Sequence, residues 1–361
     1  MINVTKPYLP DRNKLNEYID GIYDSVWLTN NGPLVRELTE RLKQYLGVDN
    51  LLLVSNATTA LQIAYKVFGI TGKAITTPFS FVATTSSLVW VGIEPTFVDI
   101  DAESLCIDPS KIESAVTPET TAIVPVHVFG NACDVETIED IAYKYGLKTI
   151  YDGAHAFGVQ YKGKSLSSYG DATILSFQAT KLFHTIEGGA IIFKNIDDYN
   201  KAKKMIYFGI DGSDLITEVG INGKMNEFQA AMGLCVLDSM DTILEKRAKI
   251  WHQYNRGLRD YLKIPHINSS ASNNFSYFPV IFESEQVLLK VKEVMNNQGI
   301  NPRRYFYPSL DTLSYLHTRS KKRVSRDISS RILCLPIYPG LEEYEAQSVI
   351  EIIKSYLLTN K

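Results

Sequence analysis

The chain has 361 residues, of which 45% are hydrophobic and 21% are charged, so it is long enough to bury a large core in one or two domains. Its net charge of -3, with the two signs interspersed, excludes a global basic field for nucleic acid or an anionic membrane. We therefore expect a globular protein without nucleic-acid or membrane partners, in which any anionic ligand needs a local site.

Short apolar runs alternate with segments of helical length over the first part of the chain. The runs are rich in branched side chains and bounded by polar, glycine or proline residues, which is typical of strands buried on both faces. They cover residues 51–55, 74–77, 96–99, 122–126 and 149–152. The helical segments cover residues 58–68, 82–91 and 135–145. This alternation predicts an α/β fold with a mostly parallel sheet, whose ligands lie at the carboxyl ends of the strands.

The pattern changes near Leu234. The elements expected after this point are a charged helix over residues 237–262, a strand around 275–282, a helix to about residue 297 and a last helix over 342–357. We expect residues 1–235 to form a large domain and residues 236–361 to form a smaller α+β domain, without internal repeats.

The cysteines and the N-terminal residues indicate the compartment. The four cysteines are scattered, form no Cys-x-x-Cys pair and do not cluster with the six histidines. We therefore expect buried reduced thiols, and neither a metal site nor a disulfide framework. The N-terminal residues contain no apolar secretion signal, and no segment reaches the length of a membrane span. These features predict a cytoplasmic protein.

Two short motifs near the middle of the chain carry an acid and an amine. Asp152 begins Asp-Gly-Ala-His at the end of a predicted strand, and Lys181 ends the run Ser-Phe-Gln-Ala-Thr-Lys that starts at Ser176. The chemistry of pyridoxal phosphate (PLP) requires a lysine amine, which forms a Schiff base with the aldehyde, and a carboxylate that keeps the pyridine nitrogen protonated. Asp152 and Lys181 can supply these two groups, so the motifs predict a PLP enzyme.

Further candidate cofactor contacts lie at suitable places, although each of them also has a structural explanation. Ala57 and Thr58 open a helix with small residues, where backbone N–H groups bind phosphate, but such residues also occur at many helix caps. Phe81 can lie flat on an aromatic ring or be ordinary core. His155 can hydrogen-bond the cofactor or be structural, and the Ser176 hydroxyl can donate to phosphate. The order of these residues along the chain favours the cofactor interpretation.

With these residues in place, the chain resembles the sugar-nucleotide aminotransferases of the DegT/DnrJ/EryC1/StrS family. The likeness extends from WLTNNGP at residues 27–33 to LPIYP at residues 335–339. Its most specific parts are PVHVFG at residues 125–130 with Asp134, IYDGAHAFG at 150–158, residues 176–189, and GINGKMNE at 220–227. The resemblance implies PLP fold type I, the aspartate aminotransferase-like fold. It also implies a homodimer with shared active sites at the subunit interface.

The resemblance assigns roles to individual residues. It implies that Lys181 forms the Schiff base, that Asp152 faces the pyridinium nitrogen and that Phe81 stacks on the ring. The phosphate contacts that it implies are Ala57, Thr58, Ser176 and, from the other subunit, Asn222.

Several positions depart from the common pattern of the family. Ala57 replaces a usual glycine, Lys224 a frequent arginine, and Asp311 a histidine found in many members. His184 lies in a variant stretch just after the lysine. Together with residues 27–33, this stretch most resembles the members of the family that make dTDP-4-amino-4,6-dideoxyglucose.

The expected reaction is therefore transfer of an amino group from L-glutamate to C4 of a dTDP-linked keto sugar, dTDP-4-keto-6-deoxyglucose, for surface polysaccharide (O-antigen) biosynthesis. The candidate substrate contacts are His184, Tyr305, Tyr307, Arg303, Arg304 and Asp311, with His127 as a further candidate. Arginines suit the pyrophosphate of a sugar nucleotide, although charged runs such as Arg303-Arg304 and Lys321-Lys322-Arg323 usually face water.

Alternatives remain open. Amination at C3 of a dTDP-3-keto-6-deoxyhexose fits the same residues, because C3 and C4 are adjacent. Fold type I also contains sulfur lyases, aldolases and amino-acid aminotransferases, and a fold does not fix a function. A catalytically inactive PLP-binding regulator would carry a partner module, for which we expect no room in this chain.

Overall fold

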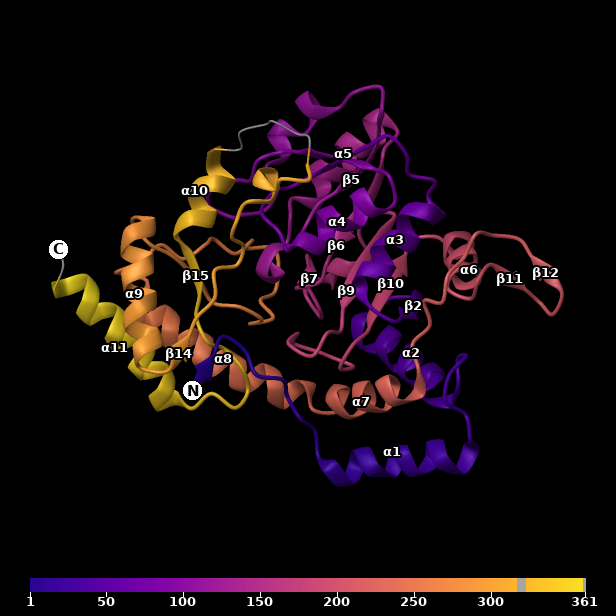
Figure 1. Cartoon of the computed structure of the whole chain (residues 1–361), viewed down its shortest axis with the longest axis horizontal. Helices are drawn as coiled ribbons and strands as arrows, with labels where there is room; N and C mark the ends of the chain where they lie inside the picture. Colours follow the sequence, from indigo (N-terminus) through magenta and orange to yellow (C-terminus); the bar gives the residue numbers. More distant parts are fainter. Residues whose placement is uncertain (317–322, 360–361) are drawn as a thin grey trace.

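The computed structural model describes residues 1–316 and 323–359, so Lys321 and Lys322 of the charged run lie outside the described residues. Its α-helices are α1 (Arg12–Ser25), α2 (Pro33–Leu46), α3 (Ala57–Val67), α4 (Val82–Trp90), α5 (Val135–Tyr145), α6 (Ile196–Met205), α7 (Glu227–Leu237), α8 (Met240–Leu258), α9 (Glu285–Asn297), α10 (Arg323–Arg331) and α11 (Glu343–Thr359). Its strands are β1 (Ile2–Asn3), β2 (Asn50–Val54), β3 (Lys73–Thr76), β4 (Glu94–Phe97), β5 (Thr120–Val124), β6 (Lys148–Asp152), β7 (Gln160–Tyr161), β8 (Lys164–Ser165), β9 (Ala172–Ser176), β10 (Gly189–Phe193), β11 (Ile210–Asp211), β12 (Leu215–Ile216), β13 (Pro279–Ile281), β14 (Ile300–Asn301) and β15 (Ile332–Cys334). The sheet strands lie in one half of the molecule, and α9, α10 and α11 lie in the other (Figure 1).

Seven strands form the central sheet, in the order β2-β10-β9-β6-β5-β3-β4. Neighbouring strands are parallel except at β10, which is antiparallel to both β2 and β9. The mostly parallel sheet predicted from the sequence is therefore confirmed. The five predicted strands match β2 to β6, and the three predicted helices match α3 to α5, with ends that differ by no more than two residues.

The sheet is buried on both faces because its strands are apolar at successive positions. On β2, Leu51 and Leu53 join a core shared with α2 and α7, whereas Leu52 and Val54 join a core shared with α3 and α6. Successive side chains of a strand point to opposite faces, so a strand that is apolar throughout needs cover on both of them. The helical segments between the strands supply this cover.

The long helix predicted for residues 237–262 corresponds to α8, which is shorter at both ends. α7 ends at Leu237 and packs against α1 and α2, and α8 begins at Met240 (Figure 1). Leu244 of α8 packs against the core of the sheet half, whereas Ile250 belongs to the core of the C-terminal half. One helix thus serves both cores, and the boundary between domains near residue 235 stays a prediction.

The first residues of the chain belong to the C-terminal half. β1 pairs in parallel with β14, and the Val4 carbonyl accepts a hydrogen bond from the Ile337 N–H at 3.1 Å. The next residue, Thr5, donates its hydroxyl to the Thr180 carbonyl at 3.4 Å. The N-terminal segment therefore runs from the C-terminal half to the residue that precedes Lys181.

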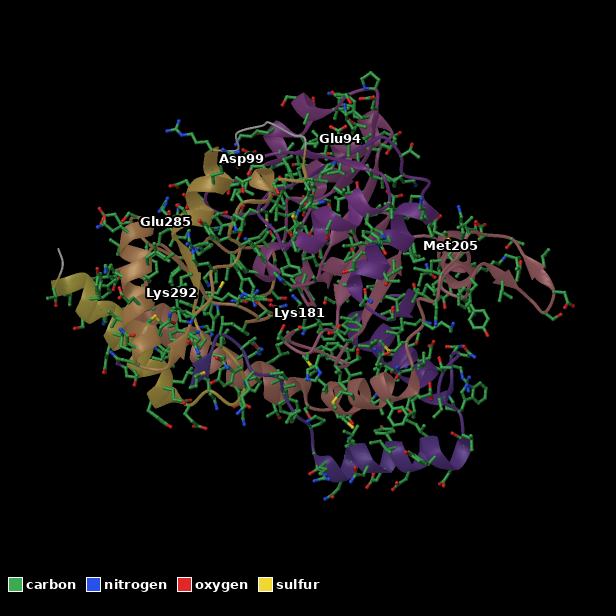
Figure 2. All side chains as sticks on the ribbon, viewed as in Figure 1. Glu94, Asp99, Lys181, Met205, Glu285 and Lys292 are labelled. Carbon is green, nitrogen blue, oxygen red and sulfur yellow. The ribbon has the colours of Figure 1, made fainter. Side chains whose placement is uncertain are left out.

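Asp99, just after β4, fixes the start of α10. Its carboxylate accepts hydrogen bonds from the N–H groups of Val324 and Ser325 at 2.9 and 2.8 Å, and from the Ser325 hydroxyl. The side chain is buried, and Figure 2 shows it beside α10. Burial alone would raise the pKa of Asp99, but these hydrogen bonds hold the pKa below its ordinary value.

An Asp99→Asn variant is expected to lower the free energy of unfolding by about 1–3 kcal/mol at neutral pH, because the amide is a weaker acceptor. Since the folded-state pKa is depressed, the stabilisation is present above the unfolded value of about 3.9 and is lost as the pH falls through the folded pKa. Urea unfolding at several pH values should show the difference from wild type shrink toward acid. Asp260→Asn, at an exposed position, is the control. An equal difference at every pH would contradict the argument.

Three further findings concern the cysteines, membrane-spanning helices and metal-ligand clusters. All four cysteines are buried free thiols, as predicted. Within residues 1–316 and 323–359, no helix is long and apolar enough to cross a membrane. The same part of the chain contains no group of three or more His, Cys, Asp or Glu side chains that could hold a metal ion.

Candidate active site

The carboxyl ends of three sheet strands meet at a cavity of about 400 Å³. β6 ends at Asp152, β9 ends at Ser176, and β2 leads into α3 through Asn56. Parallel strands place their carboxyl ends at one edge of a sheet, which brings together residues that are distant in sequence. Figure 2 shows Lys181 between the sheet and the C-terminal half of the molecule.

The cavity brings together most of the residues predicted for the site. The predicted residues that line it are Ala57, Thr58, Phe81, Asp152, His155, Ser176, Lys181, Arg303 and Tyr305. The predicted residues outside its lining are Asn222, His184, Arg304, Tyr307 and Asp311. Tyr277 also lines the cavity, although no sequence motif indicated it.

The Asp152 carboxylate is buried and hydrogen-bonded through both oxygens. Oδ2 accepts from the Thr84 hydroxyl at 2.7 Å, and Oδ1 accepts from the Ala154 N–H at 3.1 Å. Burial raises the pKa of Asp152, while the two hydrogen bonds and the charge of Lys181 oppose the rise. A buried carboxylate is strongly stabilised by a cation that lies against it, so the cavity suits a ligand with a protonated nitrogen.

Lys181 carries a partly buried amine at the same cavity. Burial lowers the pKa of Lys181 to about 8, against the opposing effect of the Asp152 charge. Its Nζ donates to the Tyr277 hydroxyl at 3.4 Å. A lysine of this pKa is partly neutral near neutral pH, and the neutral amine is the form that attacks a carbonyl carbon.

Competitive acetylation of the protein stripped of cofactor should therefore give Lys181 a titration midpoint of about 8. Ordinary lysines have a pKa of about 10.4, because water stabilises their charged form. Mass spectrometry of peptides labelled over a range of pH would measure the midpoints of Lys181 and of the surface lysines in one sample. A midpoint for Lys181 equal to that of the surface lysines would contradict the burial of its amine.

His155 offers a fixed, neutral hydrogen-bond donor. Its Nδ1 accepts from the Phe129 N–H at 3.1 Å, so Nε2 carries the ring hydrogen. The ring lies 4.5 Å from the Tyr277 ring and 5.7 Å from the Phe306 ring, centre to centre. Burial, with the charge of Lys181, holds the pKa of His155 well below its ordinary value. The imidazole is therefore uncharged at neutral pH.

The start of α3 presents backbone N–H groups at the cavity, an arrangement that suits an anion. The Asn56 side chain accepts from the Thr59 N–H at 2.8 Å, and the N–H groups of Ala57 and Thr58 belong to the first turn, which has no intrahelical acceptors. A Cβ on Gly189 of β10 would lie 2.8 Å from the Ala57 nitrogen, so only glycine permits this close approach. Ala57 does not have a positive φ, which explains why this turn tolerates alanine in place of glycine.

The expected contact of His184 with a sugar is not supported by its geometry. The ring is buried, its Nε2 lies 2.7 Å from the Tyr8 carbonyl, and its Nδ1 accepts from the Ile186 N–H at 3.3 Å. His127 is also fully buried, and its ring stacks on Tyr151 at 4.6 Å. Both histidines hold surrounding structure instead of lining the cavity.

Three other predicted sugar contacts are engaged elsewhere. Arg304 donates to the Glu285 carboxylate at 2.6 Å, and its Cζ lies 3.5 Å from the centre of the Tyr307 ring. Figure 2 shows Glu285 in the C-terminal half. Asp311 is buried and accepts from Nε of Arg326 at 2.9 Å. The sequence could not reveal these partners, which satisfy the charges of Arg304 and Asp311 away from the cavity.

Arg303 and Tyr305 are the predicted sugar contacts that do reach the cavity. The Arg303 guanidinium is exposed and lies 4.7 Å from the centre of the Tyr305 ring. Asn222 is exposed outside the cavity of its own chain and accepts from Nζ of Lys224 at 2.7 Å. A role of Asn222 toward a second subunit is compatible with this position.

A larger hollow of about 820 Å³ lies between α2, β2 and α6. Its lining includes Arg36, Lys203 and Lys224, but neither Asp152 nor Lys181. The 400 Å³ cavity is therefore the better candidate for the active site, because it combines the acid and the amine.

The DegT/DnrJ/EryC1/StrS aminotransferase family matches residues 10–354. The chain belongs to this family. It is 43% identical to the dTDP-4-amino-4,6-dideoxy-D-glucose transaminase of Shigella dysenteriae, over 98% of each chain. It is 38% identical to the Escherichia coli enzyme of the same name, over 99% of this chain and 98% of the other. The crystal structure of DesI in the presence of its TDP-sugar product has a TM-score of 0.94 and 32% identity, and covers 99% of this chain and 93% of its own.

These similarities confirm the predicted family, fold class and enzyme class. Members of the DegT/DnrJ/EryC1/StrS aminotransferase family depend on PLP. The lyase and aldolase alternatives are set aside, because the family match extends over nearly the whole chain.

Proposed function

We propose that this aminotransferase transfers an amino group from L-glutamate to C4 of dTDP-4-keto-6-deoxyglucose, giving dTDP-4-amino-4,6-dideoxyglucose for surface polysaccharide (O-antigen) biosynthesis. The observation that carries the proposal is the 43% identity, over 98% of the chain, to the Shigella dysenteriae enzyme named for that product. The Asp152 and Lys181 pair supports the class of reaction. Arg303 beside Tyr305 supports a substrate with a pyrophosphate and a ring.

The residues of the cavity fit PLP, which we propose as the cofactor. Asp152 would face the pyridine nitrogen, because its buried carboxylate is stabilised by a cation. Phe81, whose side chain is half exposed at the cavity, would lie against the ring. The first turn of α3, with Ala57 and Thr58, would hold the phosphate together with the Ser176 hydroxyl. When bound, PLP would supply an aldehyde that carries the amino group between the two substrates and a ring that accepts electrons.

Lys181 would hold the cofactor and move protons. Its pKa of about 8 places the amine between its charged and neutral forms near neutral pH, which suits a group that accepts and returns a proton at Nζ. The chain tethers the amine within reach of the reacting atoms, so proton transfer needs no second encounter. His155 would orient the cofactor with its Nε2–H, because its Nδ1 is already fixed by Phe129.

Product analysis tests the proposal directly. The purified protein would be incubated with L-glutamate and dTDP-4-keto-6-deoxyglucose, and the product examined by NMR. We expect nitrogen on C4 in the equatorial (gluco) orientation, and none with a Lys181→Ala control. Nitrogen on C3, or acceptance of the 3-keto isomer alone, would instead establish the 3-aminotransferase.

We further propose a homodimer in which Asn222 of each chain completes the cavity of the other. The β11–β12 hairpin projects from the body of the chain (Figure 1), and Leu215 and Ile216 in it are 57% and 72% exposed. Val219, three residues before Asn222, is 88% exposed. A projecting arm with such apolar side chains is well suited to burial against a second copy of the chain.

Mixed dimers of Lys181→Ala and Asn222→Asp chains should recover part of the activity that each variant lacks. In a mixed dimer, one cavity combines an intact Lys181 with an intact Asn222, whereas the other has neither. Random mixing should therefore restore up to about a quarter of the wild-type sites, since half of the dimers are mixed. Steady-state rates of verified mixed dimers provide the measurement. No recovery, or full activity in an isolated monomer, would refute the shared site.

A further inference from the structure

We propose that Tyr277 positions the amine of Lys181, and that Arg247 and Asn274 hold Tyr277 in place for this task. The inference rests on the proposed role of Lys181 in the reaction. It adds three residues that no motif of the sequence indicated.

Tyr277 is in direct contact with the amine. Its hydroxyl accepts from Nζ of Lys181 at 3.4 Å, and no other hydrogen bond to this Nζ is formed within residues 1–316 and 323–359. The Tyr277 ring lies 4.5 Å from the His155 ring and 5.8 Å from the Tyr305 ring, and both of these line the cavity. The phenol is thus fixed against the wall of the active site.

Lys181 also borders a very small space next to the segment that leads into Tyr277. A second cavity, of about 10 Å³, is lined by Lys181, Ser276 and Tyr277, among others. This is about the space of one water molecule. Ser276 and Tyr277 are therefore neighbours of Lys181 at this small space, and Tyr277 also lines the larger cavity.

Arg247 of α8 holds the backbone just before Tyr277. Its Nη1 donates to the carbonyls of Ser276 at 3.1 Å and Phe275 at 3.5 Å, and its Nε has no partner within the described residues. The guanidinium is buried and pairs with no carboxylate of residues 1–316 and 323–359, and burial lowers the pKa of Arg247 to about 10. A buried charge of this kind is unfavourable for stability, and apolar residues of similar volume often replace buried charges without loss. The guanidinium instead fixes the backbone of the two residues that precede Tyr277.

Asn274 holds the same segment to the sheet half of the molecule. Its Nδ2 donates to the carbonyls of His155 at 2.9 Å and Phe157 at 3.0 Å, and its Oδ1 accepts from the Ser276 N–H at 3.2 Å. Phe275, between them, has a φ of 54°, which is uncommon for a bulky residue. The turn before Tyr277 is therefore defined from both sides.

This arrangement suits an amine that must leave and return to one position. A displacement of about 1 Å can lower a rate on the order of a hundredfold. The phenol can accept from the charged amine and donate to the neutral amine, so it is a partner in both forms. Burial raises the pKa of Tyr277 above its ordinary value, so the phenol keeps its proton while Lys181 titrates.

Tyr277→Phe removes the hydroxyl and leaves the ring. We expect kcat to fall by about tenfold to a hundredfold, because the Lys181 amine is displaced from its position. The KM for glutamate should change little, because the variant does not alter how the substrate binds. Competitive acetylation of the protein stripped of cofactor should show the Lys181 midpoint fall further, since the hydrogen bond to the charged amine is the stronger of the two that are lost. Thermal unfolding shows whether the fold is kept.

Tyr254→Phe is the matched control. It removes another buried phenol, whose hydroxyl donates to the Pro336 carbonyl at 2.9 Å far from Lys181. This variant should lose stability but keep the wild-type kcat and Lys181 midpoint. Arg247→Met should keep or gain stability and yet lower kcat, and Arg247→Lys should restore part of the rate by offering one donor to the same carbonyls.

An unchanged kcat and Lys181 midpoint in Tyr277→Phe would overturn the proposal. Wild-type kcat in a stable Arg247→Met protein would overturn the part played by Arg247, and this variant leaves the cavity lining itself untouched. The labelling needs neither cofactor nor substrate, so its result is independent of the proposed reaction. Turnover by a Lys181→Ala enzyme would instead refute the role of Lys181 on which the inference rests.

Discussion

A Lys181→Ala variant is expected to bind PLP and yet lose transamination by about a thousandfold or more, because the side chain that holds the cofactor and moves protons is gone. The start of α3, Ser176 and Asp152 remain, so the cofactor should still bind without a covalent bond. The wild-type protein should be yellow and lose its colour when glutamate is added. The variant should keep its absorbance under the same conditions, and single-turnover absorbance measurements compare the two.

Lys194→Ala is the control for this experiment. Lys194 is an exposed lysine directly after β10, so its removal tests the loss of a lysine outside the cavity. It should have no effect on colour or rate. Full turnover by the Lys181→Ala enzyme would show that the assignment of the catalytic lysine is wrong.

Asp152→Asn is expected to lower turnover by about a hundredfold to a thousandfold, because the amide cannot stabilise a protonated pyridine nitrogen. Unlike turnover, the free energy of unfolding should not fall in this variant. Burial raises the folded-state pKa of Asp152, so its ionisation destabilises the protein stripped of cofactor as the pH rises above the unfolded value. Removing the charge should therefore leave the free energy of unfolding at neutral pH unchanged or higher. Turnover rates and urea unfolding provide the two measurements.

Asp171→Asn is the matched control at the opposite edge of the sheet. Asp171 accepts from Nζ of Lys148 at 2.8 Å and from the Thr149 N–H at 2.9 Å, at the start of β6. Its replacement should lower stability and leave turnover unchanged. Wild-type turnover in Asp152→Asn would contradict the role of that carboxylate.

The central sheet could be predicted because most of its strands carry short runs of consecutive apolar residues. Leu51 to Val54 fill cores on both faces, and this need for apolar residues at successive positions is visible in the sequence. The direction of β10 could not be predicted, because Gly-Ala-Ile-Ile-Phe is equally suited to a parallel or an antiparallel place. The strand expected around residues 275–282 is shorter, because the chain turns at Phe275 and β13 begins only at Pro279.

The residues that line the cavity were predictable where they follow a strand end. Asp152, at the end of a predicted strand, is such a case, since a parallel sheet brings its carboxyl ends together. Arg304 was misplaced because its carboxylate partner, Glu285, is distant in sequence. Tyr277 could not be found, because its place depends on long-range contacts, such as that of Arg247 with the backbone before it.

The pairing of β1 with β14 has a consequence for the order in which the protein is made. Ile2 is made before its partner Ile300, which is added 298 residues later. At about 5–20 residues per second, this delay is roughly 15–60 s. Thr5 lines the cavity and donates to the Thr180 carbonyl. The pairing of β1 with β14 holds the chain just before Thr5, so Thr5 takes its place at the cavity only after β14 has been made. A nascent chain released before residue 300 would therefore contain both Asp152 and Lys181 but lack one wall of the cavity between them.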